Sequence, residues 1–146
     1  MLKVICLKFV KSIFWLDKQK MKIAADYPLY SQDGKGKKAV CVAKFFIANW
    51  TWYILEGNFV EGKFMMFGIV LNHMDDEYGY LTIEDLESVE LKCKTPFGIL
   101  PLKVERDLYF KPTTLEKIND SYLQKFLNRF YCKEEEVEAD TEKVNR

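Results

Sequence analysis

The apolar positions of this chain fall into short runs rich in β-branched and aromatic residues, a pattern that predicts strands. Residues 39–47 and 50–56 are two such runs, separated by only two residues. This spacing predicts a β-hairpin. With a two-residue connection, the facing pairs are Phe45 with Trp52 and Ile47 with Trp50. Because both runs are apolar at nearly every position, we expect the hairpin to be central and covered on both faces.

Further runs extend this hairpin into a meander of consecutive antiparallel strands. The pattern predicts a third strand over 63–71 and a fourth over 77–81, each reached through a short turn. Residues 91–101 are expected to be irregular. A fifth strand is expected within 102–110, because Pro112 would end it.

Helix signals lie before, between and after these strands. Asp17 can cap a helix that ends before Pro28, and Thr82 can cap a short helix that ends near residue 90. Thr113 and Glu116 have the spacing of a capping box, which predicts a helical region from residue 114 to about residue 132. The fold expected is therefore α+β: an antiparallel sheet of about five strands with an N-terminal helix and C-terminal helices.

We expect one α+β domain over residues 17–132, preceded by an N-terminal extension (1–16) and followed by an acidic, disordered tail (133–146). The extension can form an amphipathic helix with lysines on its polar side, or a strand over 4–10. Such a helix either packs on the domain or lies on a membrane surface. The extension is too short to span a bilayer and lacks the features of a signal peptide.

Composition narrows the function classes. The chain has 146 residues, half of them apolar, with 22 basic and 22 acidic side chains, so its formal net charge is zero. This balance argues against wholesale electrostatic binding of nucleic acid. The sole histidine, His73, excludes metal sites that need two imidazoles, and no phosphate-binding or nucleophile motif occurs. No cofactor and no metal site are predicted, and nothing specifies an enzyme.

The four cysteines form no Cys-x-x-Cys pair, which excludes a zinc ribbon or a thioredoxin-type site. Cys6 and Cys41 lie in apolar runs and are expected to be buried, reduced thiols. Reduced thiols suit a cytoplasmic protein. His73 lies in a turn among carboxylates, where it is either solvated or a metal ligand or base.

The densest charged cluster is Glu105-Arg106-Asp107, within the fifth predicted strand. Strand alternation would place the two carboxylates on one face, where they could hold Mg²⁺ or act as acid and base in a metal-dependent hydrolase. The simpler interpretation is structural: a partly desolvated Arg106 clamps a carboxylate such as Glu56. We favour the structural interpretation.

Aromatic residues of the predicted hairpin are a second candidate site. Trp50, Trp52 and Glu56 are expected on one face, with Tyr53 on the other, and both tryptophans are expected to anchor the sheet equally. Together with Lys44 they could stack nucleic-acid bases, or form a protein-docking surface if exposed. A packed aromatic core explains the same residues, and we prefer it.

Several motifs resemble those of a bacterial family, the domain of unknown function 2958. They are residues 28–36, 44–46, 49–53, Glu56-Gly57, Phe67-Gly68, Gly79-Tyr80 and 105–110. The resemblance covers roughly residues 17–118; the chain departs from the usual pattern at the short 47–50 turn and at both ends. It implies a small bacterial protein, often encoded on plasmids, phages or other mobile elements, but supplies no reaction. Tyr80 joins the binding candidates from these motifs.

The leading function from the sequence is a non-enzymatic protein-binding module with an unidentified protein partner, acting in the cytoplasm. The genetic setting implied by the resemblance suggests counter-defence. The alternative is nucleic-acid or nucleotide binding through the lysine-rich N-terminal region and the tryptophans. The third hypothesis is the hydrolase at Glu105 and Asp107.

Overall fold

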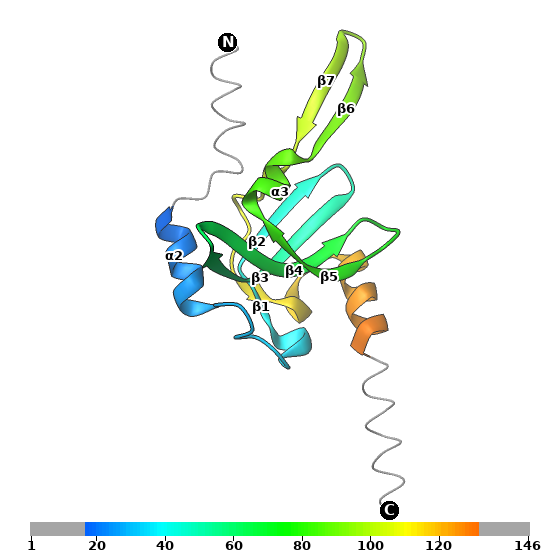
Figure 1. Cartoon of the computed structure of the whole chain (residues 1–146). Coiled ribbons are helices and arrows are strands. Elements are labelled where there is room, and N and C mark those ends of the chain that lie inside the picture. The colour runs from blue at the N-terminus through cyan, green and yellow to red at the C-terminus, as the bar shows by residue number, and fades with distance from the viewer. Residues whose placement is uncertain (1–16, 132–146) are drawn as a thin grey trace, which may run out of the picture.

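The computed structural model describes residues 17–131, which fold around a five-stranded antiparallel sheet (Figure 1). Its strand order is β5-β4-β3-β2-β8. The strands are β2 (Ala43–Ile47), β3 (Trp50–Val60), β4 (Lys63–Leu71), β5 (Glu77–Thr82) and β8 (Glu105–Arg106). The first four are consecutive, and β8 joins the outer edge of β2 from much later in the chain. The expected α+β fold with a five-stranded sheet is confirmed.

The β2–β3 hairpin has the register that its two-residue connection predicted. Phe45 pairs with Trp52, and Ile47 pairs with Trp50. Ala48 takes the connection with a positive φ of 48°, the left-handed conformation that two-residue hairpin turns require. The sequence therefore sets this register locally, before any packing is considered.

The long β3–β4 pair contains an irregularity that the sequence did not reveal. The register shifts between Ile54, which pairs with Gly68, and Glu56, which pairs with Phe67, so Leu55 is the extra residue. A Cβ atom on Gly68 would lie 2.1 Å from the carbonyl oxygen of Tyr53, so only glycine fits at this close approach. Such a bulge reverses which face the following residues point to.

Two hydrophobic clusters cover the two faces of the sheet. The first joins Trp52 and Ile54 to Ile23 of α2 (Asp17–Asp26) and Leu86 of α3 (Ile83–Ser88). The second joins the side chains on the opposite face, Tyr53 among them, to a C-terminal helix over residues 121–131. The central hairpin is thus buried on both sides, as its apolar composition predicted.

The helix caps agree with the sequence in one case and differ in the other. Thr82 and Asp85 form a complete capping box at the start of α3. Thr113 and Thr114 instead form strand β9, which pairs with β1 (Val40–Cys41). The predicted Thr113 capping box is therefore wrong: Thr113 lies within a strand, and the 3-10 turn that follows has no side-chain hydrogen bond at its cap residue, Thr114.

A single 3-10 turn, η2 (Leu115–Lys117), follows β9, and another, η1 (Gly36–Lys38), precedes β1. The C-terminal helix begins only at residue 121. Its cap is Asp120, whose Oδ1 accepts hydrogen bonds from the backbone N–H groups of Tyr122, at 3.0 Å, and Leu123, at 3.4 Å.

The expectation that residues 91–101 are irregular is wrong. They belong to a second hairpin, β6 (Glu90–Thr95) and β7 (Gly98–Lys103), which forms a sheet of its own and projects from the domain (Figure 1). The fifth strand, expected over 102–110, is correspondingly short, since β7 takes residues up to Lys103. The predictions for residues 1–16 and 133–146 lie outside the described residues. No helix among residues 17–131 is long and apolar enough to cross a membrane.

Candidate functional site

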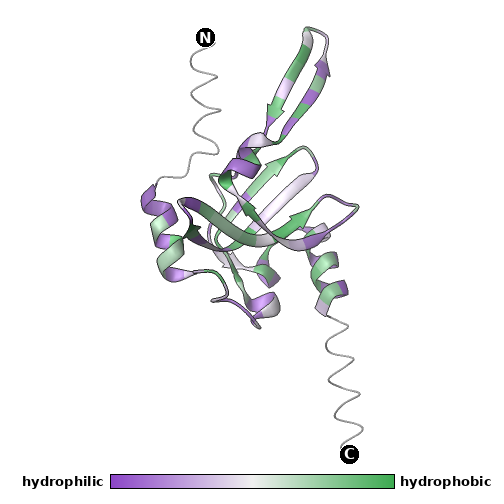
Figure 2. Ribbon diagram, in the orientation of Figure 1, coloured by the Kyte–Doolittle hydropathy of each residue, from purple (hydrophilic) through white to green (hydrophobic). Residues whose placement is uncertain are grey.

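The β6–β7 hairpin, called the arm below, is amphipathic. Its register pairs Leu91 with Leu102 and Cys93 with Leu100, and paired residues point to the same face of a two-stranded sheet. These four side chains form the apolar face of the arm. The reverse face carries Lys92, Lys94 and an ion pair between Glu90 and Lys103 at 3.1 Å, with Ile99 and Pro101 paired to the two lysines. Figure 2 shows hydrophobic and hydrophilic residues along both strands of the arm, in alternation along β6.

The apolar face of the arm is open to solvent among the described residues. Leu91, Leu100 and Leu102 are all exposed, and Cys93 is an exposed free thiol. A two-stranded hairpin without a covering layer has little stability of its own. Contiguous exposed apolar side chains of this kind mark interaction surfaces.

The tip of the arm is ordered by local hydrogen bonds and presents an aromatic ring. The Thr95 hydroxyl donates to the carbonyl of Gly98 at 2.8 Å and accepts from the backbone N–H of Phe97 at 3.2 Å. Gly98 adopts a φ of 120°, which favours glycine. Phe97 is 98% exposed, so the ring stands clear of the domain on a fixed turn. Large exposed aromatic side chains are typical anchors of protein interfaces.

The two tryptophans do not have the equal role that the sequence suggested. Trp52 is 5% exposed and belongs to the core, whereas Trp50 is 39% exposed at the end of β3. Their ring centroids are 5.8 Å apart. A buried Trp52 cannot stack a base, so the pair does not form a nucleic-acid platform.

Lys44 and Tyr53 are brought together on the other face of the sheet. The Lys44 ammonium lies 5.6 Å from the centre of the Tyr53 ring, within cation–π range. The Tyr53 hydroxyl donates to Asp120 Oδ2 at 2.6 Å. Burial, followed by this hydrogen bond, raises the pKa of Tyr53. Since Tyr53 is fully buried, its hydrogen bond to Asp120 ties the sheet to the cap of the C-terminal helix, and Lys44 packs on the Tyr53 ring.

Glu56 does not share the face of the tryptophans, because the bulge at Leu55 turns it over. Its cross-strand partner Phe67 pairs in turn with Tyr80, so Glu56, Phe67 and Tyr80 form a row across the sheet. The Glu56 carboxylate is buried and accepts hydrogen bonds from the backbone N–H groups of Tyr30 and Gln32. Burial is the largest effect on Glu56 and raises its pKa.

Tyr80, the last of this row, lies at the surface. Its ring centroid is 4.9 Å from that of Phe67. A side-chain hydrogen bond with Tyr30 raises the pKa of Tyr80. Two of the predicted candidates, Glu56 and Tyr80, are thus linked through residues of the same loop and sheet face, although they are far apart in sequence.

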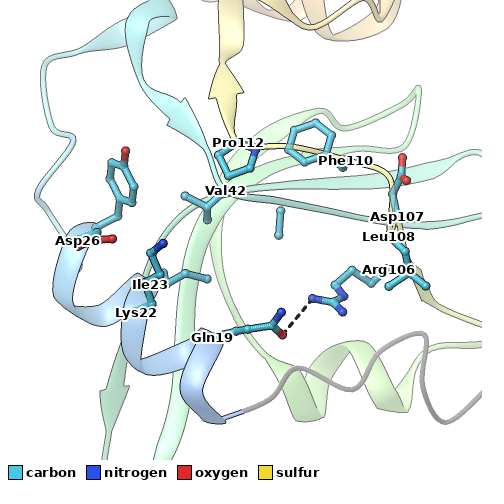
Figure 3. Close-up of a pocket in the computed structure, with 12 residues that line it drawn as sticks. Gln19, Lys22, Ile23, Asp26, Val42, Arg106, Asp107, Leu108, Phe110 and Pro112 are labelled. Atoms are coloured by element: carbon cyan, nitrogen blue, oxygen red, sulfur yellow. Dashed lines mark hydrogen bonds between the residues drawn. The ribbon is translucent and has the colours of Figure 1, made fainter.

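The Glu105-Arg106-Asp107 cluster separates in space. Arg106 and Asp107 line a hollow of about 330 Å³ beside α2, and Arg106 Nη1 donates to Gln19 Oε1 at 3.4 Å (Figure 3). Burial lowers the pKa of Arg106, as expected for a partly desolvated guanidinium. The clamp on Glu56 is not formed, because that carboxylate is held by backbone N–H groups elsewhere.

The two carboxylates of the cluster do not form the shared site that strand alternation suggested. Glu105 lines a separate hollow of about 110 Å³ with Phe46 and Lys103, because β8 ends at Arg106 and the chain turns. Asp107 instead accepts the backbone N–H of Tyr109 at 3.0 Å. Within residues 17–131, no three His, Cys, Asp or Glu side chains lie together as a metal site.

Two further residues singled out in the sequence, His73 and Cys41, have surroundings typical of a structural role. His73 lies in its turn with its ring centroid 3.9 Å from that of Tyr122. Cys41 is buried, as expected, and burial raises its pKa to about 12; Cys6 lies outside the described residues. Neither residue belongs to a group that suggests catalysis.

The arm is the feature that sequence reasoning missed, although a signal was present. Leu91, Cys93 and Thr95 alternate with charged residues, which is the period of a strand with one apolar face. Pro101 obscured the pattern in the second strand, since proline usually argues against a strand. It is tolerated here because each arm strand is an edge strand.

Comparison with known families gives one result. The family model described as "Protein of unknown function (DUF2958)" matches residues 16–121, so the resemblance suggested by the sequence motifs is confirmed over slightly more of the chain. The match includes both the sheet and the arm. Neither a curated protein nor a solved structure matches the chain. The chain belongs to the DUF2958 family of proteins of unknown function.

Proposed function

We propose that this protein is a non-enzymatic protein-binding module whose partner docks on the apolar face of the arm. The observation that carries the proposal is the amphipathic pairing of Leu91 with Leu102 and of Cys93 with Leu100, with the apolar side exposed. A partner that covered this face would supply the layer that the arm lacks. Phe97 would anchor the far end of the interface.

The free thiols Cys41 and Cys93 support a cytoplasmic location within this proposal. The family resemblance extends it to a bacterial mobile element, where a protein-binding module would act in counter-defence. The catalytic alternative has less support, since Glu105 and Asp107 line different hollows.

The test compares the tagged full chain with two double variants in a bacterial lysate. Leu100→Ser with Leu102→Ser removes half of the apolar face. Met74→Ser with Tyr109→Ser is the matched control, since both residues are exposed apolar side chains outside the arm. We expect the wild type and the control to retain the same proteins, and the arm variant to retain at least tenfold less of them. Direct titration with a purified captured protein then confirms binding.

Equal retention by the arm variant, with thermal melts showing all three proteins folded, would overturn the proposal. Loss of the captured proteins after nuclease treatment would instead favour nucleic-acid binding. Sedimentation velocity on the purified chain tests whether the partner is a second copy of this chain. A wild-type dimer, with the arm variant monomeric, would identify it as such.

A further inference from the structure

A cleft of about 280 Å³ is lined by residues of β3, β4, β5, the segment 32–39 and the C-terminal helix, and it shares no residue with the arm. Its walls include four aromatic rings and two carboxylates, and we call it the aromatic cleft. These side chains are Phe67, Tyr78, Phe130, Tyr131, Asp33 and Glu56. The volume is just below the roughly 300–1,000 Å³ that ligand pockets occupy. The cleft therefore fits a small group rather than a large ligand.

The four rings form a continuous wall. Phe67 and Tyr78 are stacked with centroids 5.7 Å apart and planes 11° from parallel. Phe130 meets Tyr78 at 5.1 Å and 66°, and Tyr131 at 5.0 Å and 68°. The hydroxyls of Tyr78 and Tyr131 are hydrogen-bonded to each other. A wall of four aromatic rings suits an organic cation, because a cation is attracted to the face of such a ring.

The polar side of the cleft is acidic. Glu56 is 2% exposed, and its carboxylate is oriented by the backbone N–H groups of Tyr30 and Gln32. Gln32 is itself fixed, because its side chain bonds to Val40 at both the carbonyl and the N–H and to the Leu55 carbonyl. The loop that carries Asp33 is therefore anchored against the sheet.

Among residues 17–131, no lysine, arginine or histidine lines the cleft. Lys35 acts on Glu56 and lowers its pKa, but this effect is smaller than the effect of burial, which raises it. A cationic ligand would offset the charge of both carboxylates while its apolar surface contacted the rings.

We propose that the aromatic cleft binds a methylated ammonium group, such as the quaternary head of a small organic cation. A methylated ammonium has few or no N–H groups, so it needs little hydrogen bonding and can replace water against aromatic walls. A metal ion would need several oxygen ligands, and the cleft offers two carboxylates of which one is already held by backbone donors. An anion would meet two like charges.

The test uses the full chain, with choline as the probe and 3,3-dimethyl-1-butanol as its neutral isostere. We expect choline to shift the amide resonances of Gly34, Gly36 and Tyr131 saturably in an NMR titration. The isostere has the same shape without the charge, and we expect it to bind at least tenfold more weakly. Equal affinities, or choline shifts confined to other regions, would overturn the proposal.

Variants of one helix provide the matched comparison. Phe130 and Tyr122 are 44% and 53% exposed on the C-terminal helix, and only Phe130 lines the cleft. Phe130→Leu is expected to weaken choline binding at least fivefold, and Tyr122→Leu less than twofold. Asp33→Asn, in an exposed loop, should also weaken binding and keeps the test open should Phe130→Leu fold poorly. Unchanged binding in both cleft variants would refute the assignment.

Discussion

The two hairpins of this molecule show how little a hairpin's own pairing says about its role. β2–β3 and β6–β7 are both antiparallel pairs joined by two residues. The first is buried between two hydrophobic clusters, whereas nearly every residue of the second is exposed. Backbone hydrogen bonds contribute little net free energy because water also provides them. Burial by the covering layers therefore makes one hairpin the core and leaves the other available for a partner.

The contrast also explains where function can lie in such a small domain. A hairpin that is packed on both faces tolerates few changes, since each side chain has a fitted neighbour. An uncovered hairpin carries side chains that stability does not require. Substitutions in the two regions should therefore differ in what they change: unfolding free energy in the core, and binding in the arm.

The largest expected effect distinguishes the two tryptophans of the core hairpin. Trp52→Ala removes a buried ring, and we expect a loss of about 3–5 kcal/mol in the free energy of unfolding. Trp50→Ala should cost about 1 kcal/mol or less, since Trp50 is partly exposed at the strand end. Urea unfolding of both variants measures the difference. Equal losses would contradict the burial seen for these residues.

The next effect concerns the bulge that places Glu56 in the aromatic cleft. Gly68→Ala would drive a Cβ against the Tyr53 carbonyl, 2.1 Å away, and overpacking of this kind costs typically about 1–3 kcal/mol. We expect a loss at the upper end, because the neighbour is backbone and cannot rotate away. Gly79→Ala is the control, since a Cβ there meets nothing within 4 Å. A fully stable Gly68→Ala would show that the bulge is not constrained.

A smaller, pH-dependent effect is expected from Glu56. Burial raises its folded-state pKa above the ordinary value of 4.5, so the folded protein binds this proton more tightly than the unfolded chain. Its contribution to stability is present below about pH 4.5 and is lost as the pH rises through the raised pKa. Glu56→Gln should remove this loss of stability at higher pH, because the amide does not titrate.

Thermal melts at several pH values between 4 and 8 check the Glu56 prediction. The stability of Glu56→Gln relative to wild type should increase with pH across that window. A Glu56→Gln difference that decreased with rising pH would contradict the sign.

The smallest stability effect is expected in the arm. Leu100→Ser should change the free energy of unfolding by no more than about 0.5 kcal/mol, because its side chain is already exposed. The measurement is the same urea titration used for the tryptophans. A loss comparable to that of Trp52→Ala would mean that the apolar face of the arm is covered within the protein, and the docking proposal would be wrong.

The sequence by itself determined the meander and the register of its first hairpin. A two-residue connection fixes which residues face each other, so the pairing of Phe45 with Trp52 followed from local geometry. Thr82 and Asp85 likewise set the start of α3 through bonds that span three residues. The family motifs were also readable, since they are contiguous. All of these features depend on neighbours in the chain.

Only the tertiary structure decided which features became sites. The bulge at Leu55 depends on the close approach of Gly68, and alternation counted along β3 alone therefore placed Glu56 on the wrong face. The exposure of Trp50 and of the arm depends on which layers cover each strand, and the aromatic cleft joins residues from a loop, three strands and a helix. A linear pattern records the period of a strand, but burial depends on surfaces that distant segments supply.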